Sequence, residues 1–336
     1  MTLEAREAER PAEPGRLAIY YGIPSLINGS NGNIERAARD FARFDVVVFG
    51  DGLQFEQAQP GRPSAGPIEH QRTSLIVRRL AALHPSLSVF GYVPLGAGVH
   101  LSPAEINDSV GRWSAMGVRG IFFDEAGFDF NVTRERQNDA IDAAHREGLR
   151  VFMNAFNPDD LEGSHLEGGD LMLLESFVVR NDVLEEPAAW FERAQRAAAI
   201  SRRTGIEVWT VTTSEGQEFD RALCTVAWWG NVLWGFNGFG WGEPGYSAEA
   251  SRMPPRDCSD GGLSRAGAYV SDVTRDGTRF LRRTESGHVE VDFARRLGRA
   301  VRDGAFTPRD DRPTPAGRAR AAARTSRGVP AERAPA

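Results

Sequence analysis

The sequence predicts an α/β protein, a single-domain (β/α)8 barrel of eight parallel strands. Short runs rich in Val, Ile, Phe and Leu alternate with longer amphipathic segments along roughly 290 residues. The runs are apolar throughout, which is typical of parallel strands buried on both faces. No Gly-x-Gly-x-x-Gly motif follows the first run, which disfavours the main alternative, an open doubly wound sheet.

The first half of the chain predicts four strands, joined by segments with helical periodicity. These runs are residues 17–21 (LAIYY), 45–49 (DVVVF), 87–93 (LSVFGYV) and 121–123 (IFF). The helix before the fourth strand has a clear start. Ser102 is the expected N-cap, Pro103 occupies the first helical position and Glu105 the third, which together form a capping box.

The second half predicts four more strands and a long final connection. These runs are residues 149–154 (LRVFMN), 170–177 (DLMLLESF), 207–212 (EVWTVT) and 231–236 (NVLWGF). The connection after the eighth strand, residues 237–290, includes an expected hairpin that turns at Ser286-Gly287. Residues 291–304 predict a closing amphipathic helix.

Changes in composition set the expected domain limits. Residues 1–15 form a charged leader, residues 16–305 the barrel domain, and residues 306–336 a disordered tail rich in Pro, Arg and Ala. The leader lacks the apolar core of a signal peptide, and no long apolar run follows. We therefore expect a soluble chain without membrane insertion, either cytoplasmic as encoded or exported by a non-standard route.

Charge and residue usage exclude several classes of function. A net charge of −6 and a pI of about 5.7 argue against nucleic-acid binding. All 40 basic residues are Arg, so Schiff-base lysine chemistry is excluded. Cys224 and Cys258 form neither a disulfide framework nor a zinc-ligand spacing, and the six His are scattered. We expect no metal and no cofactor.

Polar residues at the ends of the predicted strands mark the candidate site, because barrel active sites lie at the C-terminal ends of the strands. Asp124 and Glu175 follow apolar runs directly, where a charge is costly unless the site uses it or pairs it with a buried Arg. Glu125 is adjacent to Asp124. The candidate substrate contacts are Tyr21, Asp51, Tyr92, Asn154, Trp234, Asn237 and Trp241.

Paired carboxylates with aromatic neighbours are what glycoside hydrolysis requires. One carboxylic acid protonates the leaving oxygen, and the other carboxylate attacks the anomeric carbon or activates water. Tyr and Trp rings offer apolar faces on which sugar rings can stack. The sequence therefore indicates a glycosidase with a carbohydrate polymer as its partner.

Four segments resemble the spherulin-4-like proteins and the related barrels of glycoside hydrolase family 114. They are GIFFDEAGFD, DVVVFGDG, VFGYVPLG and VFMNAF, and the resemblance spans residues 17–240, with the first segment its most specific part. It implies a (β/α)8 barrel that cleaves polymers of α-1,4-linked galactosamine or N-acetylgalactosamine, endo-acting and free of cofactors.

The resemblance also implies roles for the matching residues. Asp124 would be the nucleophile of a retaining mechanism, Glu175 the general acid/base, and Glu125 a residue that tunes one of them or binds substrate. Because neighbours on a strand point to opposite faces, the assignment between Asp124 and Glu125 stays open. A substrate-assisted route, with Glu125 or Glu175 as the sole acid, is a second option. A carboxyl separation of about 5–5.5 Å favours retention, and about 6.5–9.5 Å favours inversion.

Two other functions remain open at this point. The barrel could be a non-catalytic glycan-binding or structural component of a larger assembly, docked through its terminal segments. An isomerase or aldolase is disfavoured, since there is no Schiff-base lysine and no phosphate-binding glycine loop after the last two strands.

Overall fold

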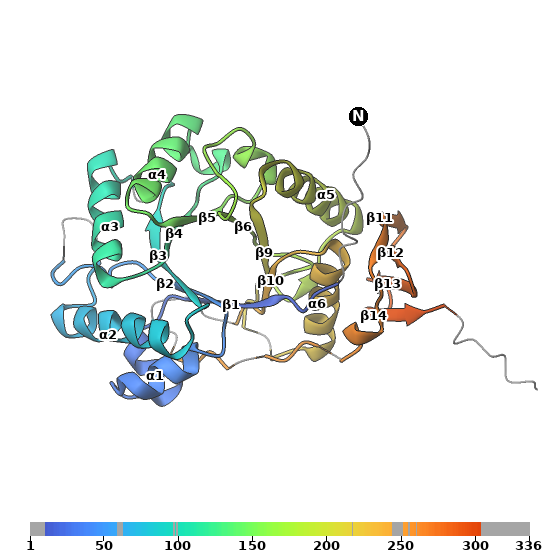
Figure 1. Ribbon diagram of the computed structural model, residues 1–336, viewed down its shortest axis with the longest axis horizontal. Helices are drawn as coiled ribbons and strands as arrows, with labels where there is room; N and C mark the ends of the chain where they lie inside the picture. Colours follow the sequence, from blue (N-terminus) through green and yellow to red (C-terminus); the bar gives the residue numbers. More distant parts are fainter. Residues whose placement is uncertain are drawn as a thin grey trace, which may run out of the picture. The chain divides into compact units, whose positions relative to one another are not determined.

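The computed structural model describes residues 11–58, 63–96, 98, 100–216, 218–243, 251–254, 256–259 and 261–303. All of them belong to one compact unit that ends at Asp303. Eight parallel strands close into a barrel with helices around it (Figure 1), which confirms the predicted (β/α)8 class. The first ten residues of the expected leader, and the whole expected tail, lie outside the described residues.

The barrel strands follow chain order, and the last pairs with the first. Around the barrel the order is β1, β2, β3, β4, β5, β6, β9 and β10, with β10 hydrogen-bonded to β1. Their bounds are Gly15–Tyr20, Val46–Phe49, Ser88–Pro94, Gly120–Asp124, Arg150–Asn154, Leu171–Leu174, Glu207–Val211 and Gly238–Gly240.

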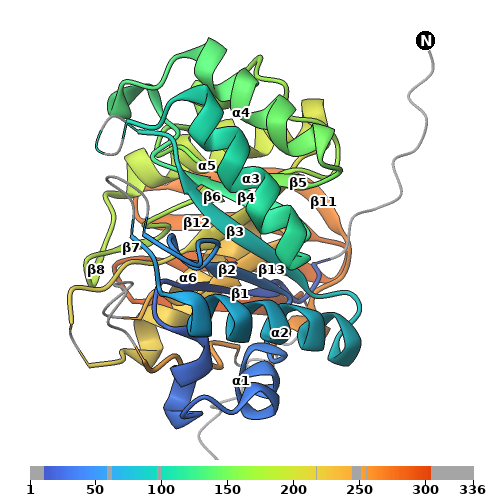
Figure 2. The same ribbon diagram turned by 90° about the vertical axis from the view of Figure 1, so that its left-hand side faces the viewer.

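Helices cover the outside of the barrel. They are α1 (Ile34–Phe41), α2 (Pro67–Leu83), α3 (Pro103–Met116), α4 (Arg134–Arg146), α5 (Pro187–Thr204) and α6 (Arg221–Trp234). Figure 2 views the molecule from the side that α2 and α3 cover. The capping box at Ser102 and Glu105 is confirmed. No helix in the described part of the chain is long and apolar enough to cross a bilayer.

Short elements lie within the connections. The 3-10 helices are η1 (Pro24–Gly29), η3 (Phe128–Phe130), η4 (Pro158–Leu161) and η5 (Leu263–Arg265). Between β5 and β6 the chain forms η4 and no α-helix. A two-stranded hairpin, β7 (Val179–Arg180) and β8 (Val183–Leu184), lies between β6 and α5.

Alternation along the strands separates two apolar cores. Residues that point inward fill the barrel, and their neighbours pack outward against the helices. Trp209 occupies the interior next to Gly238, where an added Cβ would lie 2.0 Å from the indole ring. The interior cluster is Leu17, Ile19, Val46, Val48, Phe90, Phe122, Phe152, Leu171, Leu173, Trp209 and Val211.

The predicted eighth strand, residues 231–236, is wrong. These residues continue α6, where Val232 and Leu233 are buried on the helical stripe, and Gly235 ends the helix in the left-handed region at φ 70°. The eighth strand is β10, which follows at once. A short apolar run has the same composition in a buried helix as in a buried strand, which explains the error.

The predicted closing helix, residues 291–304, is also wrong. Residues 291–303, the part of this range that the structure describes, instead complete an antiparallel sheet of β11 (Tyr269–Asp276), β12 (Arg279–Thr284), β13 (Gly287–Asp292) and β14 (Leu297–Arg302). The sheet lies beside α6 (Figure 1) and buries Phe280, Val289 and Val291. The predicted hairpin is confirmed as β12–β13. Its last pair is Thr284 with Gly287, so the turn falls one residue earlier than expected.

The two cysteines, which showed no disulfide framework in the sequence, are joined. Cys224 on α6 and Cys258 in the connection after β10 form a disulfide with a Cα–Cα distance of 5.2 Å. Both are buried. The bond attaches the connection between β10 and β11 to α6.

Candidate active site

Four polar side chains from neighbouring strands meet at the C-terminal end of the barrel. The amide Nδ2 of Asn154 donates to Asp124 Oδ1 at 2.7 Å and to Glu175 Oε2 at 2.8 Å. The hydroxyl of Tyr92 donates to the other oxygen of Asp124 at 2.9 Å. Residues at the ends of β3, β4 and β5, and just beyond β6, thus form one hydrogen-bonded cluster.

Strand alternation explains why these residues converge. Phe122, Phe152 and Leu173 point into the barrel, so the residues two positions later, Asp124, Asn154 and Glu175, point inward as well. β4 ends at Asp124, and β6 ends one residue before Glu175. Glu125 and Ser176, which follow them, adopt left-handed φ values of 52° and 54°. Such conformations are strained for residues other than Gly and concentrate at functional sites.

The two carboxylates lie close together. Because both accept from the same nitrogen, at 2.7 and 2.8 Å, the bonded oxygens can be at most 5.5 Å apart. Their environments differ. Asp124 accepts from Tyr92, Asn154 and the backbone N–H of Glu125, whereas the side chain that donates to Glu175 is Asn154.

Burial dominates the electrostatics of the pair. It raises the pKa of Asp124 above its usual range, and the bonds from Asn154 and Tyr92 oppose that rise. Burial also raises the pKa of Glu175, where the bond from Asn154 opposes it and the charge of Asp124 adds to it. The pKa of Tyr92 is strongly raised, first by burial and then by Asp124, so its hydroxyl stays protonated and donates.

Glu125 turns away from the cluster. Its side chain packs against the β3–α3 loop, where a Cβ added at Gly96 would lie 2.3 Å from Glu125 Oε2. Burial and the charge of Asp124 raise its pKa. The sequence leaves open whether Asp124 or Glu125 points into the barrel, and in the structure it is Asp124.

A buried ion pair behind Glu175 was missed by the sequence reasoning. Arg193 of α5 binds both oxygens of Glu185, at 2.8 and 2.9 Å, and donates to the carbonyls of Glu175 and Ser176. Glu185 in turn accepts from the N–H of Val178. The pair thus holds the turn that follows β6. The available signal was an Arg on the buried stripe of α5, three residues after Trp190.

Arg119 and Arg180 are the arginines close to Asp124 and Glu175 in the sequence that could have paired with these acids. Arg119 donates to the carbonyl of Pro85. Arg180 lies close enough to Glu175 to lower its pKa, although less than Arg193 does.

Of the five remaining predicted substrate contacts, Tyr21 and Asp51 border the cluster and Trp241 lies at the same end of the barrel. The ring of Tyr21 packs edge-on against Tyr92 at 5.3 Å. Asp51 accepts from Gln54, and its charge contributes to the raised pKa of Tyr92. Trp241 follows β10 and packs edge-on against Phe219.

The other two predicted contacts are not brought to the cluster. Asn237 precedes β10 at its N-terminal end, where its side chain accepts from the N–H of Val208. Trp234 ends α6 outside the barrel and stacks on Phe236. The sequence predicts both residues at the site only because it predicts residues 231–236 as the eighth strand.

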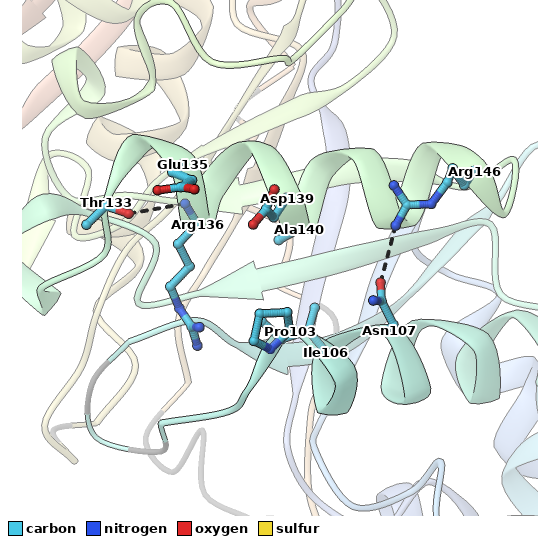
Figure 3. Close-up of a pocket in the computed structure, with 9 residues that line it drawn as sticks. All are labelled: Pro103, Ile106, Asn107, Thr133, Glu135, Arg136, Asp139, Ala140 and Arg146. Carbon is cyan, nitrogen blue, oxygen red and sulfur yellow. Dashed lines mark hydrogen bonds between the residues drawn. The ribbon is translucent and has the colours of Figure 1, made fainter.

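A separate pocket of about 410 Å³ lies outside the barrel, between α3 and α4 (Figure 3). Arg136 extends from α4 toward α3 and donates to the carbonyl of Leu95, while Arg146 bonds Asn107 across the two helices. This pocket lies in the helical layer, away from the acids. In the described part of the chain, no three His, Cys, Asp or Glu side chains are grouped to hold a metal ion.

Comparisons with known proteins found similarity only among solved structures. No protein-family model matches the chain, and no curated protein matches it. Among solved structures, the glycoside hydrolase domain of PelA from Pseudomonas aeruginosa is 13% identical, with 71% of this chain and 99% of that chain covered and a TM-score of 0.46.

Barrels with other chemistries match about equally well. The 3-dehydroquinate dehydratase from Geobacillus kaustophilus HTA426 is 11% identical, covering 72% of this chain and 87% of its own, with a TM-score of 0.44. The HpcH/HpaI aldolase from Desulfitobacterium hafniense DCB-2 is 11% identical, covering 69% and 86%, with a TM-score of 0.40. The neighbours are thus barrel enzymes that include a glycoside hydrolase domain, and similarity at this level does not separate hydrolases from lyases or aldolases.

Proposed function

We propose that the protein is a retaining, endo-acting glycoside hydrolase related to the spherulin-4-like and glycoside hydrolase family 114 proteins. One observation carries the proposal, namely that Asn154 bridges Asp124 and Glu175 so that the bonded oxygens are at most 5.5 Å apart. Retaining enzymes hold their carboxyl groups about 5–5.5 Å apart and inverting enzymes about 6.5–9.5 Å apart, and a hydrogen-bond donor shared by the two acids supports the shorter separation.

The hydrogen bonds support the division of roles. Asp124 accepts from Tyr92, from Asn154 and from the N–H of Glu125, and these donors stabilise a carboxylate anion. Glu175 receives fewer bonds, and the nearby charge of Asp124 favours its protonated form. Asp124 therefore serves as the nucleophile and Glu175 as the general acid.

The reaction then takes two steps. Asp124 attacks the anomeric carbon while Glu175 gives its proton to the departing glycosidic oxygen, which leaves a glycosyl ester on Asp124. Glu175, now ionised, takes a proton from a water molecule, whose oxygen attacks the anomeric carbon. Asp124 is released as a carboxylate and Glu175 is protonated again.

The substrate follows from the family resemblance, which points to a polymer of galactosamine or N-acetylgalactosamine. The disulfide between Cys224 and Cys258 supports the use of an extracellular polymer, because such bonds persist in oxidising compartments.

The test is hydrolysis of galactosamine-containing polysaccharides, followed by measuring released reducing ends. We expect Asp124→Asn and Glu175→Gln to lower the rate at least 10³-fold, since each removes a group that takes part in bond cleavage. NMR of the first product should show retained anomeric configuration, and a 2-fluoro glycosyl substrate should label Asp124.

Other outcomes identify the alternatives. Retention without a labelled Asp124 would reject Asp124 as the nucleophile, and an inverted product would reject the retaining mechanism. If the wild type releases no more ends than the double variant on any glycan, the non-catalytic barrel is the better account.

A further inference from the structure

A groove of about 630 Å³ lies next to the turn that follows β6, where Arg193 holds the carbonyls of Glu175 and Ser176. It is bordered by the segment after β5, the β7–β8 hairpin and the first turns of α5. Two contacts connect it to the candidate acid. Arg193, which lines it, donates to the Glu175 carbonyl at 2.7 Å, and Phe156 follows two residues after Asn154.

Phe156 presents an aromatic ring to this groove. The residue is 37% exposed, which is unusual for a large apolar side chain next to a buried cluster. Two guanidinium groups hold the ring, with Arg180 at 5.2 Å and Arg193 at 5.0 Å from its centroid. Such cation–π contacts fix the ring in place while part of it stays accessible.

The two arginines differ in what they can offer a ligand. Arg193 is buried, and Glu185 and the backbone occupy its donors. Arg180 is exposed, and it makes no ion pair with any residue in the described ranges. The hairpin that carries it is fixed, because its tip residue Asp182 bonds the backbone of Thr213 and Glu215.

The positions of the two carboxylates indicate in which direction a glycan chain would bind along the groove. A general acid must lie next to the glycosidic oxygen that departs, so the leaving part of the glycan is on the side of Glu175. The ring of Tyr92, with Tyr21 against it, lies on the side of Asp124. The glycone therefore belongs near the tyrosines and the leaving chain near Phe156.

We propose that this groove is the leaving-group subsite, in which Phe156 stacks on the apolar face of a pyranose unit and Arg180 donates to its hydroxyl or acetamido oxygens. The assignment rests on the proposed glycosidase function and adds the direction of chain binding to it. Two other carboxylates, Glu186 and Glu192, line the groove along α5, and Glu186 is already engaged as the N-cap of that helix.

The test compares two substrates that differ only in the leaving group. One is an N-acetylgalactosamine oligosaccharide long enough to fill both sides of the acid pair, and the other is a glycosyl fluoride of a shorter chain. Fluoride is too small to reach the groove. We expect Phe156→Ala and Arg180→Gln each to lower kcat/KM at least tenfold on the oligosaccharide, and Phe156→Ala to leave fluoride hydrolysis within twofold of wild type.

Phe128→Ala is the matched control. Phe128 is also an exposed aromatic residue, 47% exposed, and Arg134 lies over its ring at 5.2 Å, but it does not line this groove. We expect it to behave as wild type on both substrates. The subsite is rejected if Phe156→Ala leaves oligosaccharide hydrolysis unchanged or slows both substrates equally.

Calorimetry separates this proposal from the proposed function. If the wild type hydrolyses neither substrate, its binding of the same oligosaccharide is compared with that of Phe156→Ala. Weaker binding by the variant keeps the groove as a glycan site and rejects catalysis, whereas no binding by the wild type rejects both.

Discussion

At the residue scale, Asn154 is the side chain that stabilises the pair of carboxylates by donating to both. Burial raises the pKa of Glu175, and repulsion from the nearby Asp124 carboxylate raises it further. Asn154 places one amide hydrogen on each of them. The arrangement favours the state in which one of the two acids is protonated and the other is a carboxylate, as a general acid and a nucleophile require.

The raised pKa of Glu175 predicts a pH-dependent cost in stability. When a carboxyl group has a higher pKa in the native protein than in the unfolded chain, its protonation stabilises the fold. This contribution is complete below the unfolded pKa of about 4.3. That contribution is lost as the pH rises through the higher native pKa. Glu175→Gln should therefore raise Tm at pH 7.5, by about 2–4 °C for a gain of about 1 kcal/mol, and leave Tm unchanged near pH 4.

Thermal unfolding followed by circular dichroism at both pH values checks this expectation. Glu192→Gln, on the exposed face of α5, is the control and should follow the wild type. A Glu175→Gln protein with the same pH dependence as wild type would show that burial of this carboxyl costs nothing.

At the element scale, Arg193 joins α5 to the turn that follows β6. Its guanidinium holds the carbonyls of Glu175 and Ser176, and Glu185 neutralises it. Arg193 also lowers the pKa of Glu175. Because the Arg does not touch the reacting atoms, we regard it as a positioning residue.

Arg193→Lys keeps the charge but loses the forked bonds, so kcat should fall about 10- to 100-fold through misplacement of Glu175. Arg193→Gln removes the charge as well, so the pKa of Glu175 should rise and the alkaline limb of the pH–rate profile should move to higher pH. Arg203→Gln, which breaks an exposed ion pair on the same helix, is the control.

The pH–rate profile is the decisive measurement for Arg193. A role that is only structural predicts loss of activity at every pH with the alkaline limb in place. Far-UV circular dichroism confirms folding of each variant, since an unpaired Glu185 in a buried position can cost about 3–5 kcal/mol.

Elements differ in how well the sequence predicts them. The first seven barrel strands lie within a few residues of their predicted positions, because each apolar run is bounded by polar segments. The eighth was misplaced because α6 is apolar on most of its surface, with both the barrel and the β11–β14 sheet covering it. The sequence predicts a helix at residues 291–304 because their apolar residues recur at a helical spacing.

At the scale of the whole molecule, a disulfide bond that local sequence patterns do not predict holds the connection after β10. The disulfide joins Cys224 to Cys258 across 34 residues of sequence. Closing a loop of this length stabilises a fold by about 3–4 kcal/mol in the chain-entropy model.

We therefore expect Cys224→Ser/Cys258→Ser to lower Tm, and reduction of the wild type to lower it by a similar amount. Differential scanning calorimetry with and without reductant measures both. Reductant should leave the double Ser variant unchanged, and an identical Tm for oxidised and reduced wild type would contradict a stabilising role.

The sequence by itself determined the barrel and the strand ends at which the carboxylates, Tyr92 and Asn154 meet. These follow from local periodicity and from the rule that parallel strands present their C-terminal ends together. The tertiary structure decided that Asp124 faces inward rather than Glu125, that Arg193 lies behind Glu175, and that Cys258 reaches Cys224. It also decided that residues 231–234 are helical. Each depends on contacts between segments far apart in the chain, which local patterns do not encode.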